Sequence, residues 1–226
     1  MRAVALVAAA GRGERLGADV PKALLRISGR PLLDFAMQTV DACDEVEAVV
    51  VAAPPDRLDE IADVANVWAK LIEVVEGGES RHASIRAALA AVPDGFDAVV
   101  CHDVARPFAS AALFAAVLIA LDHADGAVPT LPVHDTVKRM NGSEIGETVP
   151  RDGLVLAQTP QAFRRRVLEA AHRAAVVDGF EGTDDAALVE RAGYTLVSVP
   201  GDPSNLKLTT AADLRVATAL AVGLRG

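Results

Sequence analysis

The chain alternates short, continuous apolar runs with longer segments in which apolar residues recur at helical spacing. The apolar runs predict buried strands at residues 3–10, 48–53, 71–75, 98–101, 127–133, 154–157 and 195–200. Unbroken apolar strands are typical of parallel sheets that are covered on both faces. The intervening segments predict helices that open at residue 31, near residue 56, within 77–85, and at residues 110, 164, 183 and 210. This alternation predicts an α/β fold: a single doubly wound, mostly parallel, Rossmann-like sheet in one domain that spans residues 1–226.

Two segments depart from this alternation. The run at residues 127–133 contains Pro129 and Pro132, which cannot donate to a sheet, so we expect that strand to be short or to lie at an edge. Residues 134–150 are polar, charged and rich in turn formers around Asn141-Gly142, a pair that favours a tight hairpin turn. This pattern predicts a β-arm that buries little against its own domain and needs another surface.

Composition and charge narrow the possible functions. The 226 residues are 51% hydrophobic, carry a net charge of -9 and have a pI near 5.0. A nucleic-acid partner would require a basic face, so none is expected. An acidic protein that binds anionic substrates must gather its cations locally, which makes clustered Arg and Lys residues informative.

Cysteine usage and hydropathy indicate the cellular compartment in which we expect the protein. Cys43 and Cys101 form neither a disulfide framework nor a metal-binding spacing, so we expect a reducing, cytoplasmic location. No apolar run approaches the roughly 20 residues that a membrane span needs, so no membrane association is expected.

The most informative stretch is LVAAAGRGERLGADVPK at residues 6–22. The apolar run ends at Gly11, and a glycine-punctuated loop with the cations Arg15 and Lys22 follows. Glycine lets backbone N–H groups approach an anion and the cations neutralise it, so the loop suits a polyphosphate. The loop lacks the Gly-Lys-Ser/Thr string of a Walker motif. It also misses the dinucleotide pattern G-x-G-x-x-G, because Gly17 falls one residue late.

Two further polar segments follow predicted strands. Gly77-Gly78 lies where doubly wound sheets bind ligands, although a simple turn with a serine cap fits the same residues. In HDVARP at residues 102–107, Asp103 and Arg106 are interpreted either as a polar centre for metal, ribose or phosphate, or as a pair that fixes the loop. His102 is interpreted as a packed or hydrogen-bonded residue rather than as a catalyst.

Five strings carry a resemblance to a known family. They are AAAGRGERLGADVPK at residues 8–22, HDVARP at 102–107, DTVKR at 135–139, AQTPQAF at 157–163 and NLKLT at 205–209. In this order and spacing they resemble the 2-C-methyl-D-erythritol 4-phosphate cytidylyltransferases of the non-mevalonate isoprenoid pathway. The resemblance spans essentially the whole chain. It implies a nucleotidyltransferase fold whose projecting arm, residues 134–151, reaches a second subunit in a homodimer.

The resemblance also implies an activity and a set of site residues. The activity is transfer of CMP from CTP to 2-C-methyl-D-erythritol 4-phosphate, by in-line attack of the substrate phosphate on the α-phosphorus and release of pyrophosphate. Mg²⁺ would be bound mainly through the CTP phosphates, with no dedicated protein metal site. The implied catalytic residues are Arg15, Lys22 and Lys207. The implied nucleotide contacts are Ala9, Ala10, Gly11, Gly13, Gly78, Glu79, Ser84 and Asp103. The implied polyol phosphate contacts are Arg106, Thr159 and Thr183, with Thr136 and Arg151 supplied by the partner's arm.

Departures from the family pattern leave alternatives open. Ser80 and Ala83 stand where acidic residues are frequent, and Pro150 replaces the acidic residue that usually precedes Arg151. A related cytidylyltransferase for ribitol 5-phosphate shares most of the strings, although DTVKR favours the methylerythritol phosphate enzyme. A non-catalytic nucleotide-sensing module is disfavoured because the charged site residues are retained together. A Rossmann oxidoreductase is disfavoured by the glycine spacing.

Overall fold

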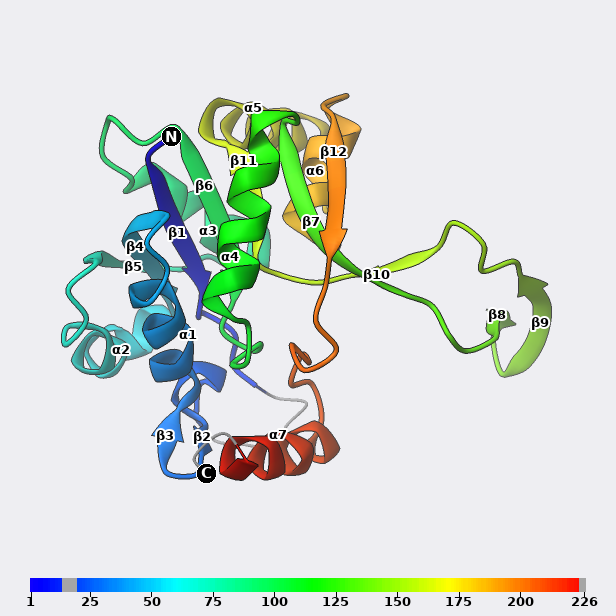
Figure 1. Cartoon of the computed structure of the whole chain (residues 1–226), viewed down its shortest axis with the longest axis horizontal. Helices are drawn as coiled ribbons and strands as arrows, with labels where there is room; N and C mark the ends of the chain where they lie inside the picture. Colours follow the sequence, from blue (N-terminus) through cyan, green and yellow to red (C-terminus); the bar gives the residue numbers. More distant parts are fainter. Residues whose placement is uncertain (14–19, 224–226) are drawn as a thin grey trace.

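A computed structural model describes residues 1–13 and 20–223. Its centre is an eight-stranded sheet in the order β10-β7-β11-β6-β1-β4-β5, with β12 paired to β7 (Figure 1). The strands are β1 Ala3–Ala8, β4 Val46–Ala53, β5 Leu71–Glu76, β6 Ala98–Asp103, β7 Gly126–Pro132, β10 Val155–Ala157, β11 Gln161–Arg164 and β12 Leu196–Pro200. β1, β4, β5 and β6 run parallel, β12 runs parallel to β7, and β10 and β11 are antiparallel to their neighbours. These pairings confirm the predicted mostly parallel sheet.

Helices cover both faces of this sheet (Figure 1). They are α1 Leu32–Asp41, α2 Leu58–Ala65, α3 Arg81–Ala90, α4 Ala111–Ile119, α5 Arg165–Asp178 and α6 Asp185–Arg191. The last helix, α7 Ala211–Gly223, lies beside a small hairpin of β2 Arg26–Ile27 and β3 Arg30–Pro31 (Figure 1). Three short 3₁₀ turns complete the fold: η2 Lys22–Leu24, η3 Pro55–Arg57 and η4 Ala120–Asp122. Across the residues that the structure describes, none of the helices combines the length and the apolar character that crossing a membrane requires.

The side chains of β1 show why its sequence is apolar without alternation. Ala5 and Val7 belong to the hydrophobic core beside α1 and α4, whereas Val4 and Leu6 belong to the core beside α3 and α5. Successive strand residues face opposite sides of a sheet, so a strand with a core on each side needs apolar residues at every position. The doubly wound fold is therefore confirmed at the level of individual side chains.

The proline-containing strand differs from its prediction. β7 has seven residues and lies inside the sheet, beside β10, β11 and β12, so the expectation of a short or edge strand is wrong. The strand changes partners along its length: Gly126 and Ala127 pair with β11, while residues 130–132 pair with β10. Pro129 falls between these two ladders and Pro132 ends the strand, so neither proline needs to donate at an occupied position.

A second difference is β11 itself. The sequence pattern predicts that the segment after residue 157 leads directly into a helix, whereas the structure inserts a four-residue strand there. β11 runs antiparallel between β6 and β7, with Ala162 and Phe163 buried. Four residues are too few to show a strand period, which explains why the sequence alone does not reveal it.

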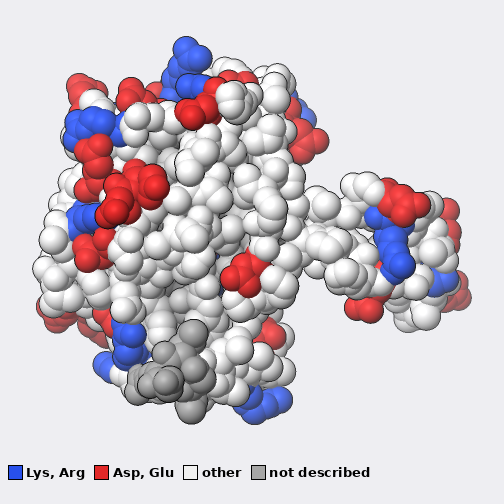
Figure 2. All heavy atoms as spheres, in the orientation of Figure 1, with Lys and Arg blue, Asp and Glu red and all other residues white. Residues whose placement is uncertain are grey.

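Residues 134–150 form the predicted hairpin arm, which projects from the domain (Figure 1). β8 Val137–Asn141 and β9 Glu144–Val149 pair with each other in a separate two-stranded sheet. Gly142 in their turn has a φ of 63°, a left-handed conformation that glycine adopts without steric cost. In the space-filling view, the arm is a separate lobe that carries both signs of charge (Figure 2). Its role in dimer formation stays a prediction.

Candidate active site

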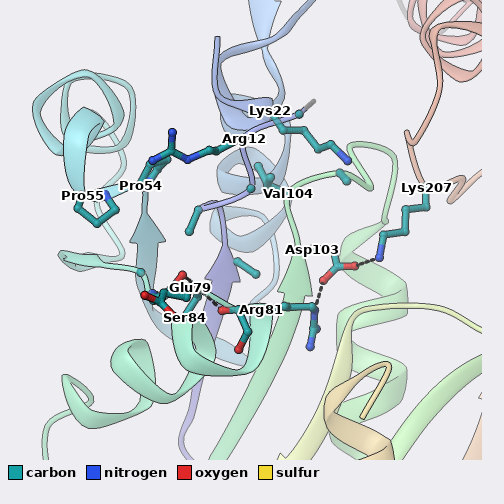
Figure 3. Close-up of a pocket in the computed structure, with 18 residues that line it drawn as sticks. Arg12, Lys22, Pro54, Pro55, Glu79, Arg81, Ser84, Asp103, Val104 and Lys207 are labelled. Carbon is teal, nitrogen blue, oxygen red and sulfur yellow. Dashed lines mark hydrogen bonds and ion pairs between the residues drawn. The ribbon is translucent and has the colours of Figure 1, made fainter. Parts of the chain in front are cut away.

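A cavity of about 770 Å³ opens at the carboxyl ends of the parallel strands. Its walls come from the loop after β1, the end of β4, the β5–α3 loop and the end of β6, and Lys207 lies at one side (Figure 3). β1 has β4 on one side and β6 on the other, so the chain reverses its direction of winding at this edge. Open α/β sheets bind ligands at such a switch point.

Most of the predicted catalytic and nucleotide-binding residues line this cavity. They are Ala10, Gly11, Gly13, Lys22, Gly78, Glu79, Ser84, Asp103 and Lys207. Ala9 does not, because its side chain is buried in the core and its amide donates to the Ala52 carbonyl at 2.9 Å. The predicted catalytic Arg15 lies outside the described residues.

Lys22 connects two distant parts of the chain at the cavity. Its amide donates to the Gly11 carbonyl at 3.0 Å and closes the base of the glycine-rich loop. Its Nζ atom donates to the Leu208 carbonyl at 2.9 Å, in the loop of residues 205–209. The ammonium therefore lies where the loop after β1 meets the 205–209 loop, and both loops can present cations to one ligand.

The β5–α3 loop forms the opposite wall and is packed too tightly for side chains. A Cβ atom at Gly77 would lie 2.5 Å from the Ala10 Cβ atom, and one at Gly78 would lie 2.4 Å from the Ala83 Cβ atom. Ser84 Oγ accepts from the Gly78 amide at 3.2 Å and donates to a backbone carbonyl of the same loop at 2.9 Å. The expected serine cap is present, because Ser80 Oγ accepts from the Ala83 amide at 3.1 Å at the start of α3. The two glycines leave no room for side chains beside it.

Asp103 is the charged centre of the cavity wall (Figure 3). Its Oδ1 atom accepts from Arg81 Nε at 2.7 Å, and its Oδ2 atom lies 2.6 Å from Lys207 Nζ. Asp103 ends β6, Arg81 begins α3 and Lys207 lies in the 205–209 loop, so three separate elements meet at one carboxylate.

Burial and charge act in opposite directions on these groups. Burial raises the pKa of Asp103, but Arg81 and Lys207 together lower it by more, so this pKa lies well below its usual range. Burial lowers the pKa of Arg81, but Asp185 and Asp103 raise it above its ordinary value. Asp103 is therefore ionised and Arg81 is charged at neutral pH.

His102 has a structural role, as predicted. Its Nε2 atom donates to the Arg106 carbonyl at 3.2 Å, which leaves Nδ1 to accept from the Thr159 hydroxyl at 3.2 Å. Burial lowers the pKa of His102 to about 4, so the ring is neutral. Thr159 Oγ1 also accepts from the Asp103 amide at 3.1 Å. This buried network fixes the end of β6 and hence the position of Asp103.

Hydrogen bonds from the segments that follow β6 and precede β11 hold the 205–209 loop in place. Arg106 Nη1 donates to the Asn205 carbonyl at 2.7 Å, and the Leu208 amide donates to the Ala105 carbonyl at 2.8 Å. The buried Gln158 side chain donates to the Asp202 carbonyl just before this loop at 2.9 Å and to the Asn205 carbonyl at 3.3 Å. Arg106 lies outside the cavity lining and holds the loop that carries Lys207.

The remaining predicted contacts lie away from the cavity of this chain. Thr183 is exposed before α6, and Thr136 is exposed at the base of the arm. Arg151 is also exposed and its Nη1 atom donates to the His134 carbonyl, which joins the two ends of the arm.

Arg81 is the charged residue of the site that the sequence patterns do not reveal. It lies in the first turn of α3, where the helix dipole disfavours a cation. A basic residue in the first turn of a predicted helix could therefore have indicated that nearby carboxylates hold it in place. Among the described residues, no cluster of three or more His, Cys, Asp and Glu side chains is arranged to hold a metal ion.

A switch-point cavity lined by a glycine-rich loop and by lysines from two loops defines the class of protein. Backbone amides beside glycines, and cations at a switch point, are groups that suit a polyphosphate, so the fold and the cavity are those of an α/β nucleotidyltransferase.

Comparisons with known proteins identify the family within this class. Residues 3–222 match the family model described as IspD: 2-C-methyl-D-erythritol 4-phosphate cytidylyltransferase. Proteins of that name from Saccharopolyspora erythraea and Frankia casuarinae are 44% and 42% identical, with alignments that cover 97% of this chain and 99% and 81% of theirs. The crystal structure of the Thermus thermophilus protein of that name has a TM-score of 0.82 at 37% identity, covering 98% of this chain and 100% of that one. The chain belongs to the IspD family of cytidylyltransferases.

Proposed function

We propose that this chain transfers CMP from CTP to 2-C-methyl-D-erythritol 4-phosphate and releases pyrophosphate. The observation that carries the proposal is the convergence of Lys22 and Lys207 on the cavity whose other wall is the glycine pair beside Ser84. Cations on one side suit the phosphates, and tightly packed backbone on the other suits a flat base. Family membership supplies the substrate class.

The chemistry requires positioned charges rather than a protein nucleophile. An oxygen of the polyol phosphate forms a bond to the α-phosphorus of CTP, and the bond from that phosphorus to the bridging oxygen of pyrophosphate breaks. Lys22 and Lys207 hold the phosphates in line and neutralise charge that develops on the α-phosphate. Arg15, by family resemblance, adds a further cation from the same glycine-rich loop.

Base selection is assigned to the β5–α3 loop. Gly78 and Ser84 are joined through the serine hydroxyl, and Glu79 lies beside them in the cavity. Fixed backbone donors and acceptors distinguish the amino group of cytosine from the carbonyl of uracil, because the wrong base leaves them unpaired.

Mg²⁺ fits the donors of the cavity only as an ion held chiefly by the triphosphate. Among the described residues, the carboxylates that line the cavity are Glu79 and Asp103, and both oxygens of Asp103 already face cations. Phosphate oxygens and water would therefore hold the ion, with Glu79 or Asp103 as outer ligands. When bound, Mg²⁺ would neutralise charge on the phosphates.

A homodimer in the cytoplasm completes the proposal. The arm and its return strand expose large apolar side chains, namely Met140, Ile145, Leu154, Val155 and Leu156. A second copy of the chain would cover them and receive Arg151 and Thr136 near its polyol phosphate. The buried, unpaired thiols of Cys43 and Cys101 suit a reducing compartment.

Product analysis tests the proposed function. The chain is incubated with CTP, Mg²⁺ and either 2-C-methyl-D-erythritol 4-phosphate or ribitol 5-phosphate, and the product is identified by mass. We expect the cytidine diphosphate adduct of methylerythritol, with pyrophosphate released in equal amount. An adduct formed with ribitol 5-phosphate alone would reassign the substrate. CTP binding without any product would favour a nucleotide sensor.

Subunit complementation tests the shared site. Arg151→Ala and Lys22→Ala homodimers should each be nearly inactive. A heterodimer of the two variants would hold one doubly damaged site and one intact site, and random exchange makes about half of the dimers mixed, so about a quarter of the wild-type sites should return. Differently tagged chains confirm the exchange. Confirmed heterodimers without activity would show that the arm does not complete the neighbouring site.

A further inference from the structure

Behind Arg81 lies a second carboxylate that does not line the cavity. Asp185, the first residue of α6, is 0% exposed, and its Oδ2 atom accepts from Arg81 Nη1 at 2.7 Å. Arg81 Nε donates to Asp103 at the same time. The guanidinium therefore bridges one carboxylate at the cavity and one in the protein interior.

A third helix, α5, packs against Asp185 at the interior end of this bridge. His172 of α5 places its Nε2 atom 3.5 Å from Asp185 Oδ1, and both atoms are buried. A buried carboxylate without a cation is strongly unfavourable, so Asp185 and Arg81 hold each other in one geometry. The planar guanidinium suits this bridge because its donors point in fixed, divergent directions.

Lys207, the other cation on Asp103, is held much less firmly. Its side chain is 41% exposed, against 22% for Arg81, and Asp103 is its ion-pair partner among the described residues. The ammonium lies on a flexible stem, whereas Arg81 is anchored on the side away from the cavity. A phosphate that enters the cavity therefore draws Lys207 from Asp103 more easily than it draws Arg81.

We propose that Asp185 is a positioning residue of the active site. It anchors Arg81 against Asp103, so that Lys207, and not Arg81, is the cation that exchanges Asp103 for a substrate phosphate. Asp103 keeps Arg81 as its partner throughout, which preserves the orientation of the cavity wall. This role rests on the proposed function, because it needs a phosphate substrate in the cavity.

The substitution Asp185→Asn removes the interior charge and keeps the size of the side chain. Arg81 is then free to turn into the cavity and bind the triphosphate in the ground state. We expect kcat to fall about tenfold or more through misplacement of the site. The Kd of CTP, measured by calorimetry, should stay unchanged or fall. Weaker CTP binding together with the lower kcat would indicate a general structural loss and would overturn the proposal.

Asp184→Asn is the matched control. Asp184 is the neighbouring carboxylate and the N-cap of α6, and its side chain contacts the Ala187 amide and the Gln161 side chain rather than Arg81. Asparagine also caps helices well, so kcat should stay within about threefold of the wild-type value. A loss equal to that of Asp185→Asn would assign the effect to the helix instead of to Arg81.

A double-mutant cycle isolates the route of action. In an Arg81→Gln background, Asp185→Asn should lower kcat by less than about twofold, because its effect passes through Arg81. A double variant whose loss in kcat equals the product of the two single losses would contradict this route. If Asp185→Asn does not fold, Arg81→Lys tests the same bridge. One ammonium cannot hold both carboxylates, so kcat should fall by a similar factor. Wild-type kcat in Arg81→Lys would overturn the proposal.

The outcomes separate this role from the proposed function. A wild-type chain that neither binds CTP nor forms product contradicts the proposed function. An active wild-type chain with an unchanged kcat in Asp185→Asn contradicts only the role of Asp185.

Discussion

Gly77→Ala is the smallest change that should disturb the site without touching a charged group. The new methyl carbon would lie 2.5 Å from the Ala10 Cβ atom and 2.9 Å from Ser84 Oγ. Carbon atoms rest about 3.5–4.0 Å apart, so the two cavity walls must separate by about 1 Å. Ala10 has no rotamer to change, and the Gly77 amide is bonded to the Ala53 carbonyl at 2.7 Å, so the backbone itself has to move.

This displacement should reduce both stability and activity. Overpacking of this kind costs about 1–3 kcal/mol, which lowers the Tm of a chain of this size by about 3–9 °C. In the proposed binding mode the two walls hold the base and the phosphates of one nucleotide, so a shift of about 1 Å should lower kcat/KM for CTP by about 100-fold.

Thermal unfolding and the rate of pyrophosphate release measure these two effects. Gly11→Ala is the control for stability, because a Cβ atom there would have no atom of the described residues within 4 Å, and its Tm should match the wild-type value. Gly77→Ala with an unchanged Tm and an unchanged kcat/KM would refute the reasoning, since it would mean that the two walls can separate without cost or that the nucleotide does not span them.

The remaining predictions concern charge, base and pH. Lys22→Ala and Lys207→Ala should each lower kcat by about 10²–10³, or roughly 3–4 kcal/mol, because each removes a stabilising donor; steady-state rates check this, and near-normal turnover in both would remove these lysines from the mechanism. CTP should exceed UTP in kcat/KM by about 10- to 100-fold, because uracil leaves buried groups unpaired; equal values would place the base elsewhere. The pKa of His102 is lowered to about 4, so the unfolded chain takes up a proton that the folded chain does not as the pH falls toward 4. The unfolding free energy should therefore fall by up to roughly 3 kcal/mol between about pH 6.5 and pH 4. Denaturant titrations across that range check it, and His102→Gln should remove this part of the slope.

The fold could be predicted largely from local patterns. Unbroken apolar runs such as the one in β4 mark strands with a core on each face, and the serine before α4 marks a helix start. These signals are local because they depend on burial and on capping within a few residues. The interior position of β7 depends instead on which strands pair with each part of it. When that pairing is unknown, its two prolines wrongly indicate a short or edge strand.

The position of a site residue could be predicted only where it follows from a single continuous segment of the sequence. The glycine-rich loop follows β1 and Asp103 is the last residue of β6, so their place at the carboxyl edge could be inferred from the order of elements. Arg81 could not be, because its role depends on Asp103 and Asp185, which lie 22 and 104 residues away along the chain. The structural task of Arg106, which fastens the 205–209 loop, likewise depends on a partner 99 residues away.

The distribution of charge explains how an acidic chain can host two anionic substrates. The protein carries a net charge of -9, yet the described lining of the cavity holds Arg12, Lys22, Arg81 and Lys207 against two carboxylates. One of these carboxylates, Asp103, is paired on both oxygens, so it orders the cations without repelling the phosphates. The negative exterior repels anions at a distance, whereas the cavity attracts them within about a Debye length of 8–10 Å. Affinity for phosphates therefore depends on the few cations that the loops bring together, and each of them is worth more here than it would be on a basic protein.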